Sequence, residues 1–245
     1  MNSRLPIRFI FFSTLISTLS LLVACGGGGN DPGVAPITGT VTCPTFTTGD
    51  AFTYQHNSSI TINSIGTFTL SSFTRTVTVI PSTAGKADME ARFSHNSDVD
   101  TYYHNSNTSN FELISTNHVS TSETSTVTYA TPYKLCTPPT VGDIYTATVV
   151  TTNTTTSTST TTTAKTEVTL VGTESVTVPA GTYPSARRID TITRFYDSSG
   201  THMAGSDVTS NLWFDDNAGE VKSVTKKSGS YSTYTGEITN TIERQ

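Results

Sequence analysis

Apolar side chains alternate with threonine and serine along much of this chain, which is the pattern of β-strands. Phe68 and Leu70 stand between hydroxyl-bearing residues, and Val77 and Val79 alternate with threonine in the opposite phase. Threonine suits a strand because its branched Cβ fits a pleated surface. The change of phase at Ser71-Ser72 predicts a β-bulge. The pattern predicts an all-β fold, built as a curved antiparallel sheet of many strands.

Turn signals separate these strands, and no helical stripe of apolar residues is sustained. Asp215 to Gly219 reads as a turn, so the segments on either side form a hairpin. The low-complexity tract 151–163 is open to three interpretations: a polar loop, a glycan-accepting stretch or one long strand. We favour two strands with the tract as their exposed hairpin end. Gly85 to Phe93 is the nearest approach to a helical pattern and allows a turn or two of helix.

The first 24 residues have the organisation of an export signal. Arg4 and Arg8 give a positive start, and the run from Phe9 to Ala24 is apolar but short for a bilayer span of about 20 residues. The sequence Leu22-Val23-Ala24-Cys25 resembles the lipobox of bacterial lipoproteins. The alternative is a buried cysteine at the end of an ordinary anchor helix.

The lipobox resemblance implies that Cys25 is acylated and becomes the first residue of the mature protein. Two or three acyl chains, at about 0.8 kcal/mol per buried methylene, then hold the protein on the membrane. Gly26 follows the cysteine where an Asp marks inner-membrane retention, so the resemblance favours the outer membrane. The expected organisation is a signal peptide (1–24), a flexible leash (25–42) and a single β domain (43–245).

The charge balance argues against nucleic acid as a partner. Loss of Arg4 and Arg8 with the signal leaves 12 basic and 19 acidic residues, a net charge of −7. The largest basic clusters are the pairs Arg187-Arg188 and Lys226-Lys227, and a nucleic-acid binder needs a basic face. The expected partners are the membrane, through the lipid, and either an apolar ligand or an envelope protein.

With Cys25 consumed by lipid, the two other cysteines form a candidate disulfide. Cys43 and Cys136 each open the pattern C-x5-G-D-x-[FY]-T, and an oxidising compartment favours a bridge between them. A disulfide that closes a loop of about 90 residues lowers the entropy of the unfolded chain, which stabilises the fold by roughly 4–5 kcal/mol in the entropy model. The alternative is that Cys43 lies in the leash and never meets Cys136.

The cysteine motifs belong to a wider pattern that suggests an internal duplication, with halves at about 43–135 and 136–245. Val77 to Ile80 resembles Val176 to Val178, and Asn110 to Leu113 resembles Asn211 to Phe214. Each match is weak, but their order is kept. Together they favour two related β segments.

The second half resembles a recurring pattern of uncharacterised bacterial exported proteins, V-P-A-G-T-[FY] followed by W-[YF]-A-x-G-V-G-x-V-K. Here the two elements are Val178 to Tyr183 and the stretch from Trp213 to Lys222, which departs from the pattern at Asp215 to Ala218. The resemblance covers about 136–227 well and 44–135 faintly. It implies a half-barrel akin to the lipoprotein carriers, and it brings no catalytic residues.

No catalytic motif stands out, and we expect no enzyme activity, cofactor or metal. G-x-S-x-G, H-E-x-x-H and a glycine-rich phosphate loop do not occur. Asp98, Asp100 and His104 are close enough for a weak metal site, but a polar loop is the simpler interpretation. Asp215-Asp216 suits a solvated turn better than a general acid–base pair, and Trp213 is expected in the core.

Three functions remain open from the sequence. The leading one is a non-enzymatic envelope lipoprotein whose concave face binds an apolar ligand or a protein partner. The second is a structural or surface-exposed protein that displays the threonine-rich tract. The third is a hydrolase with a dispersed site, which requires convergence of acidic residues with some of the five histidines, His56, His95, His104, His118 and His202.

Overall fold

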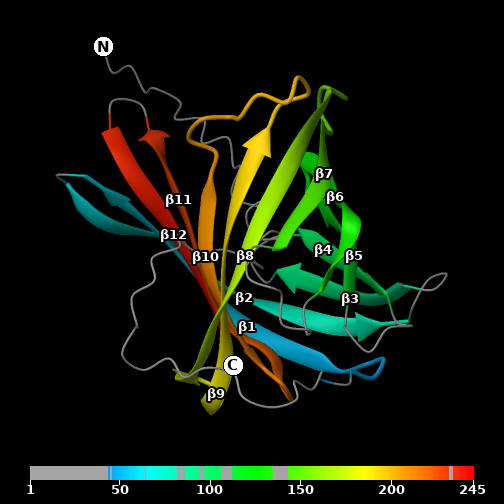
Figure 1. Cartoon of the computed structure of the whole chain (residues 1–245), viewed down its shortest axis with the longest axis vertical. Helices are drawn as coiled ribbons and strands as arrows, with labels where there is room; N and C mark the ends of the chain where they lie inside the picture. Colours follow the sequence, from blue (N-terminus) through cyan, green and yellow to red (C-terminus); the bar gives the residue numbers. More distant parts are fainter. Residues whose placement is uncertain are drawn as a thin grey trace.

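The structure is a computed structural model, and it describes Pro44 and residues 46–63, 65–81, 86–93, 97–105, 112–134, 143–231 and 234–245. These residues form twelve β-strands and no helix (Figure 1). In chain order the strands are β1 Ala51–Ile62, β2 Gly66–Ile80, β3 Lys86–Phe93, β4 Val99–Asn105, β5 Glu112–Val119, β6 Glu123–Lys134, β7 Asp143–Asn153, β8 Ser159–Val178, β9 Gly181–Tyr196, β10 Val208–Asp215, β11 Gly219–Tyr231 and β12 Tyr234–Arg244.

All twelve strands belong to one antiparallel sheet that closes on itself as a barrel. Each strand pairs with the next in the chain, and β1 pairs with both β2 and β12. The all-β class and the curved antiparallel sheet are therefore confirmed. The pairing of Tyr54 with Arg244 through Ile62 with Gly236 carries the predicted curvature to full closure. Closure removes the outer edges that an open sheet exposes.

The predicted turns and the bulge lie close to where the sequence placed them. The tract 151–163 forms the β7–β8 hairpin, whose turn at Thr154–Thr158 lies at the upper end of the barrel in Figure 1. Asp215 Oδ1 accepts hydrogen bonds from the backbone N–H groups of Asn217 and Ala218, which fixes the β10–β11 turn. The β2 bulge falls at Leu70, opposite Ser58 and Ser59, one residue before the expected site. In the segment that allowed a turn or two of helix, Lys86–Phe93 forms strand β3 instead.

The barrel interior is filled by side chains of the protein itself. Along the strands, buried and exposed positions alternate, as in β10, where Val208, Ser210, Leu212 and Phe214 are buried. The main cluster is made of Tyr54, Val77, Tyr102, Leu113, Val127, Tyr129, Tyr133, Tyr145, Ala147, Val149, Ala164, Val168, Ile189, Leu212 and Ile242. It draws on strands around the whole barrel, so the barrel has a packed core.

The lower end of the barrel is held by the long β8–β9 hairpin. The N–H of Ala180, in its turn, donates to the carbonyl of Arg244 at 3.1 Å. Arg244 in turn donates to the carbonyl of Ala218 and stacks on the ring of Phe52 at 4.5 Å. A second, smaller cluster of Val176, Val178, Ala186 and Val221 lies in this region. The hairpin is therefore tied to the end of β12, and Arg244 links that end to β1.

Trp213 lies outside the main core cluster, which corrects the prediction that it shares the core with Phe214, and it packs against the smaller cluster instead. Leu212 and Phe214 on either side of it are buried, and alternation turns Trp213 to the other face of the sheet. It is half-buried there, with Arg188 and Lys222 each 5.9 Å from its ring, and it donates to Glu174. The indole thus has charged groups of neighbouring strands around it in addition to the smaller apolar cluster.

The strand order bears on the predicted duplication without deciding it. Asp50 precedes β1 and Asp143 opens β7, six strands further on. Val77 lies in β2 and Val176 in β8, again six strands apart, but Leu113 in β5 and Phe214 in β10 differ by five. The duplication stays a prediction.

Candidate functional site

The strongest concentration of buried ionisable groups lies inside the barrel, on β2, β4, β5 and β11. Asp100 on β4 and His118 on β5 are direct cross-strand partners. The Nδ1 atom of His118 lies 2.6 Å from Oδ1 of Asp100, and the two side chains are 1% and 0% exposed. Alternation of the strands carries both groups to the inner face, where water does not reach them.

Burial and mutual attraction shift the pKa of both groups upward. Burial raises the pKa of the Asp100 carboxyl, although the hydrogen bond from His118 opposes this effect. Burial on its own lowers the pKa of His118, but the hydrogen bond and negative charge of Asp100 outweigh burial and raise it overall. The pair therefore holds protons more tightly than the two groups do in water.

Arg75 on β2 forms the second part of the network. Its guanidinium donates to the hydroxyl of Tyr102 at 3.5 Å, lies 3.9 Å from Glu220, and sits 5.3 Å from the ring centre of Tyr54. Tyr54 donates to the backbone carbonyl of Glu220 at 3.2 Å, and Ser223 donates to the carboxylate of Glu220 at 2.8 Å. Arg75 is only 5% exposed, so these contacts replace its hydration.

The pKa shifts around Arg75 show that its neighbours offset the effect of burying its positive charge. Burial alone lowers the pKa of Arg75, but Tyr102, Glu220, Tyr54 and Asp100 together raise it. Burial raises the pKa of Glu220 against the opposing charge of Arg75. Burial also raises the pKa of both phenols, Tyr54 and Tyr102. Arg75 stays charged, and the two tyrosines stay neutral.

Several polar atoms of this network are buried without a hydrogen-bond partner among the described residues. They are Nε of Arg75, Oδ2 of Asp100, Nε2 of His118 and the hydroxyl of Thr116. Thr116 pairs with Tyr102 across β4 and β5, so these atoms come from neighbouring positions. Buried groups of this kind are costly, and they limit how well the network stabilises the fold.

The arrangement contains part of a hydrolytic triad but gives a substrate no access. A carboxylate that orients a histidine is the base half of such a triad, and Ser125 on β6 is the cross-strand partner of His118. The hydroxyl of Ser125, however, shares a hydrogen bond with Thr151 at 3.1 Å. Asp100, His118 and Ser125 are each at most 2% exposed. This geometry suits a structural role inside the sheet.

The described part of the segment proposed for a weak metal site or a polar loop is largely a strand. Residues 99–105 form strand β4, with Asp100 and His104 buried on it and Asp98 buried just before it. Within the described residues, no three His, Cys, Asp or Glu side chains gather closely enough to hold a metal ion. Asp100 is instead committed to His118.

Three of the predicted site residues lie outside the described residues: Cys25, Cys43 and Cys136. The lipid anchor and the disulfide therefore stay predictions. Of the five histidines, His95 also lies outside. His56, His104 and His118 are buried, and His202 is exposed, with its Nε2 atom 2.6 Å from Asp207.

Asp215 and Asp216 have different roles: Asp215 holds a turn, and Asp216 forms an ion pair. Asp215 fixes the backbone of the β10–β11 turn, as expected of a solvated hairpin. Asp216 lies 2.7 Å from the guanidinium of Arg187, which is 3% exposed and sits over the ring of Phe214. Burial lowers the pKa of Arg187 despite the neighbouring carboxylate of Asp216. The two carboxylates thus serve the hairpin rather than acid–base chemistry.

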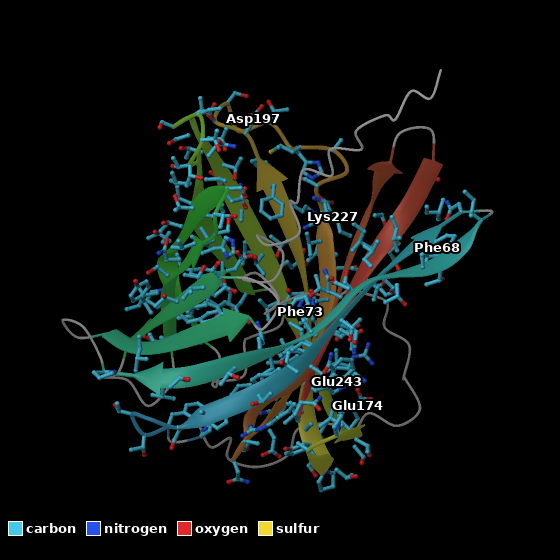
Figure 2. The ribbon with its side chains drawn as sticks, turned by 180° about the vertical axis from the view of Figure 1, so that it is seen from behind. Phe68, Phe73, Glu174, Asp197, Lys227 and Glu243 are labelled. Atoms are coloured by element: carbon cyan, nitrogen blue, oxygen red, sulfur yellow. The ribbon has the colours of Figure 1, made fainter. Side chains whose placement is uncertain are left out.

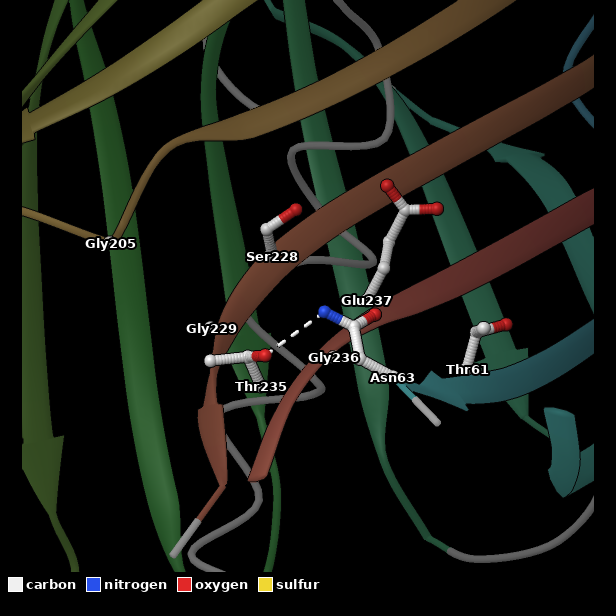
Figure 3. A pocket seen from close by; sticks show the side chains of 8 residues that line it. All are labelled: Thr61, Asn63, Gly205, Ser228, Gly229, Thr235, Gly236 and Glu237. Carbon is white, nitrogen blue, oxygen red and sulfur yellow. Dashed lines mark hydrogen bonds between the residues drawn. The ribbon is translucent and has the colours of Figure 1, made fainter. Parts of the chain in front are cut away.

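A groove of about 540 Å³ lies where β11 and β12 meet the end of β1 (Figure 3). Its lining consists of Thr61, Asn63, Gly205, Ser228, Gly229, Thr235, Gly236 and Glu237. Asn63 donates to the hydroxyl of Thr235 at 3.0 Å, as drawn in Figure 3, and Glu237 pairs with Lys226 at 2.9 Å. Its lining combines hydroxyl, amide and carboxylate groups with apolar surface from three glycines. It has no large apolar side chain, so it offers an apolar ligand little to pack against.

Sequence reasoning missed the central residues of the network, Arg75, Glu220 and the pairing of Asp100 with His118. One signal was present: Arg75 is in phase with Val77 and Val79, so it belongs to the buried face of β2. A charged residue in an apolar phase indicates a buried partner. The identity of that partner depends on pairings across the barrel.

Comparisons with known proteins add little. No protein-family model matches the sequence, and no curated protein matches it significantly. Among solved structures, the chain is similar to a protein from Parabacteroides distasonis that is provisionally classed as a lipoprotein. The identity is 12%, the match covers 84% of this chain and 99% of the other, and the TM-score is 0.41. A similarity this distant carries no conclusion about function. In the described part of the chain, no helix has the length and apolar character needed to cross a membrane.

Proposed function

We propose that this chain is a lipoprotein of the bacterial cell envelope, held by acyl chains on Cys25, with a non-enzymatic binding role. The support for the anchor is the order of the N-terminal residues: a basic start, an apolar run of 16 residues from Phe9 to Ala24, and the lipobox ending at Cys25. Gly26, in place of an Asp, favours the outer membrane. About two acyl chains suffice for stable anchoring.

The packed interior favours a protein partner over an apolar ligand. An apolar ligand needs a concave apolar face, and in this barrel that face is filled by the main cluster around Leu113, Val149 and Leu212. The described groove is lined by glycines and polar side chains, without a large apolar side chain. Binding is therefore assigned to the outer surface, where Ile65, Phe68 and Leu70 expose apolar side chains on one hairpin. The filled interior is the observation that carries this choice.

The anchor is tested by replacing the acylated thiol. Cells expressing the native chain or Cys25→Ser are fed a fatty acid that carries an alkyne tag and are then fractionated. The native chain is expected to take up the tag and to stay with the membranes, and the variant is expected to take up none. A variant that is tagged as strongly as the native chain contradicts the proposal.

A structural or display role is the second candidate, and one observation favours it. The β7–β8 hairpin carries an exposed turn, Thr154 to Thr158, at one end of the barrel. Asn153 accepts two backbone hydrogen bonds in this turn, so the threonines are held in a defined arrangement. Protease added to intact cells separates the candidates: cleavage places the domain outside the cell, and protection with cleavage after lysis places it in the periplasm.

A further inference from the structure

The first half of β2 has only one strand beside it among the described residues. Between Arg75 and Thr78, β2 pairs with β1 on one side and β3 on the other. From Gly66 to Ser72 its partner is β1, and no described strand pairs with its other edge. Backbone N–H and C=O groups along such an edge can pair with a further strand. The barrel is thus closed along most of its length, but one hairpin extends beyond the closed part (Figure 1).

This hairpin presents apolar side chains to solvent. Ile65, Phe68 and Leu70 are 51%, 46% and 49% exposed, and Figure 2 shows Phe68 near the protruding end. The chain from Ala51 to Thr74 contains no Asp, Glu, Lys or Arg, although the protein as a whole has a net charge of −5. Natural proteins protect exposed edges with charges, prolines or bulges. This edge has only the bulge at Leu70.

We propose that the Gly66–Ser72 edge joins a second copy of this chain, as an antiparallel pairing of β2 with β2 about a two-fold axis. A strand that pairs with itself in this way makes the same contacts twice, as a two-fold interface requires. When the axis passes near Thr69, Phe68 of one copy lies opposite Leu70 of the other. This pairing of an aromatic with an aliphatic side chain is favourable across strands.

The charge distribution favours a second copy over an oppositely charged partner. Two copies of an acidic protein repel each other over most of their surfaces, and the uncharged hairpin is where they approach without like-charge contact. Anchoring by Cys25, on which this part of the argument rests, confines both copies to one plane. That confinement raises their effective concentration relative to free solution.

The size of the contact sets the expected strength. Seven residues at about 3.3 Å each give a paired length of roughly 23 Å. A single strand pairing of this length buries less surface than the roughly 1,200 Å² of a stable interface. The dimer is therefore expected to be weak in solution. The soluble domain should therefore dimerise only at high concentration.

The test is a cysteine scan along the edge, made in the soluble Cys25→Ser background. Thr67→Cys, Thr69→Cys and Ser71→Cys are oxidised at high protein concentration, and the disulfide-linked dimer is measured on a non-reducing gel. Self-pairing places one position opposite its own copy, so the dimer yield should peak at one residue and fall on both sides. The background without added cysteine reports any linkage through Cys43 or Cys136.

Sedimentation equilibrium gives an independent readout at several concentrations. Leu70→Lys places one lysine on each side of the two-fold axis, within the paired segment, and should weaken dimerisation at least tenfold. Ile144→Lys is the matched control, because Ile144 is 63% exposed on β7, away from the edge, and it should leave dimerisation unchanged.

A monomer at every concentration, together with a flat cysteine scan, overturns the proposal. Binding of the soluble protein to vesicles of phosphatidylethanolamine and phosphatidylglycerol that is lost in Leu70→Lys, with no dimer, also overturns it by assigning the hairpin to lipid. The proposed function fails separately. A peaked scan in a protein that is never acylated contradicts the anchor alone, and an acylated protein with a flat scan contradicts this inference alone.

Discussion

Replacing His118 by leucine should destabilise the barrel far more than the same change at His202. Both histidines lie 2.6 Å from a carboxylate, His118 from Asp100 and His202 from Asp207. The first pair is at most 1% exposed, whereas the side chains of the second are 41% and 38% exposed. Removing one partner of a buried pair leaves an uncompensated charge and costs about 3–5 kcal/mol. An exposed pair contributes about 0.2–1 kcal/mol.

The double variant Asp100→Leu/His118→Leu separates a charge effect from a packing effect. It removes both charges, so it should recover most of the stability lost in His118→Leu, because apolar replacement of a whole buried pair is often close to neutral. The free energy of unfolding is measured for the four proteins by urea denaturation at pH 6.5. Equal losses in His118→Leu and His202→Leu, or a double variant less stable than His118→Leu, would refute the reasoning.

The same double variant also tests the pKa shifts. The pKa of His118 is raised above its ordinary 6.5, so the folded state binds this proton more tightly than the unfolded chain does. The stabilisation is fully present below pH 6.5 and is lost as the pH rises through the folded pKa. Asp100 is also raised, from 3.8, and its contribution declines in the same direction. The stability of the native protein relative to the double variant should therefore fall from pH 5 to pH 9, and an increase would contradict both shifts.

Two other predictions concern backbone and cross-links. Gly236→Ala should destabilise the fold by about 2 kcal/mol or more, because the new Cβ would lie 2.6 Å from the carbonyl oxygen of Thr61. Gly200→Ala has open space around it and a φ of +83°, so it should cost only about 1 kcal/mol. Thermal unfolding compares the two variants, and equal losses of stability would count against the close approach at Gly236. Cys43 and Cys136 should resist alkylation in the unfolded, unreduced protein and react after reduction, and alkylation before reduction would show that no bridge exists.

The sequence was sufficient to predict the fold class and several turns, because these depend on local patterns. Asp215 to Gly219 holds the residues that a tight turn uses, and the structure has a hairpin there. The threonine tract lies between two segments with a strand pattern, so the sequence predicts a hairpin there, and β7 and β8 form it. The phase change in β2 located the bulge to within one residue. Each feature is set by neighbours along the chain.

Closure of the barrel and the buried network could not be predicted in this way. A half-barrel and a closed barrel share one strand pattern, and the difference is the pairing of β1 with β12, at opposite ends of the domain. The partners in the network are also distant in sequence: Asp100 and His118 are 18 residues apart, and Tyr54 bonds to Glu220, 166 residues away. The register of the sheet brings them together, and register is decided by packing across the whole barrel.

Trp213 shows how one residue of phase changes an assignment. Both residues of the apolar pair Trp213-Phe214 look like core residues, but successive side chains of a strand point to opposite faces, so only one of the two can enter the barrel interior. Phe214 is 3% exposed inside the barrel, and Trp213 contacts Arg188 and Lys222 on the other side. Arg188 and Lys222 supply the cations that make the outer position favourable for an indole.

The most direct test of the proposed function is mass spectrometry of the N-terminal peptide from protein extracted from the native envelope. The proposal predicts a chain that begins at Cys25, with a diacylglyceryl group on the thiol and an acyl chain on the new amine. An unmodified Cys25 within a chain that begins further upstream would contradict the lipid anchor.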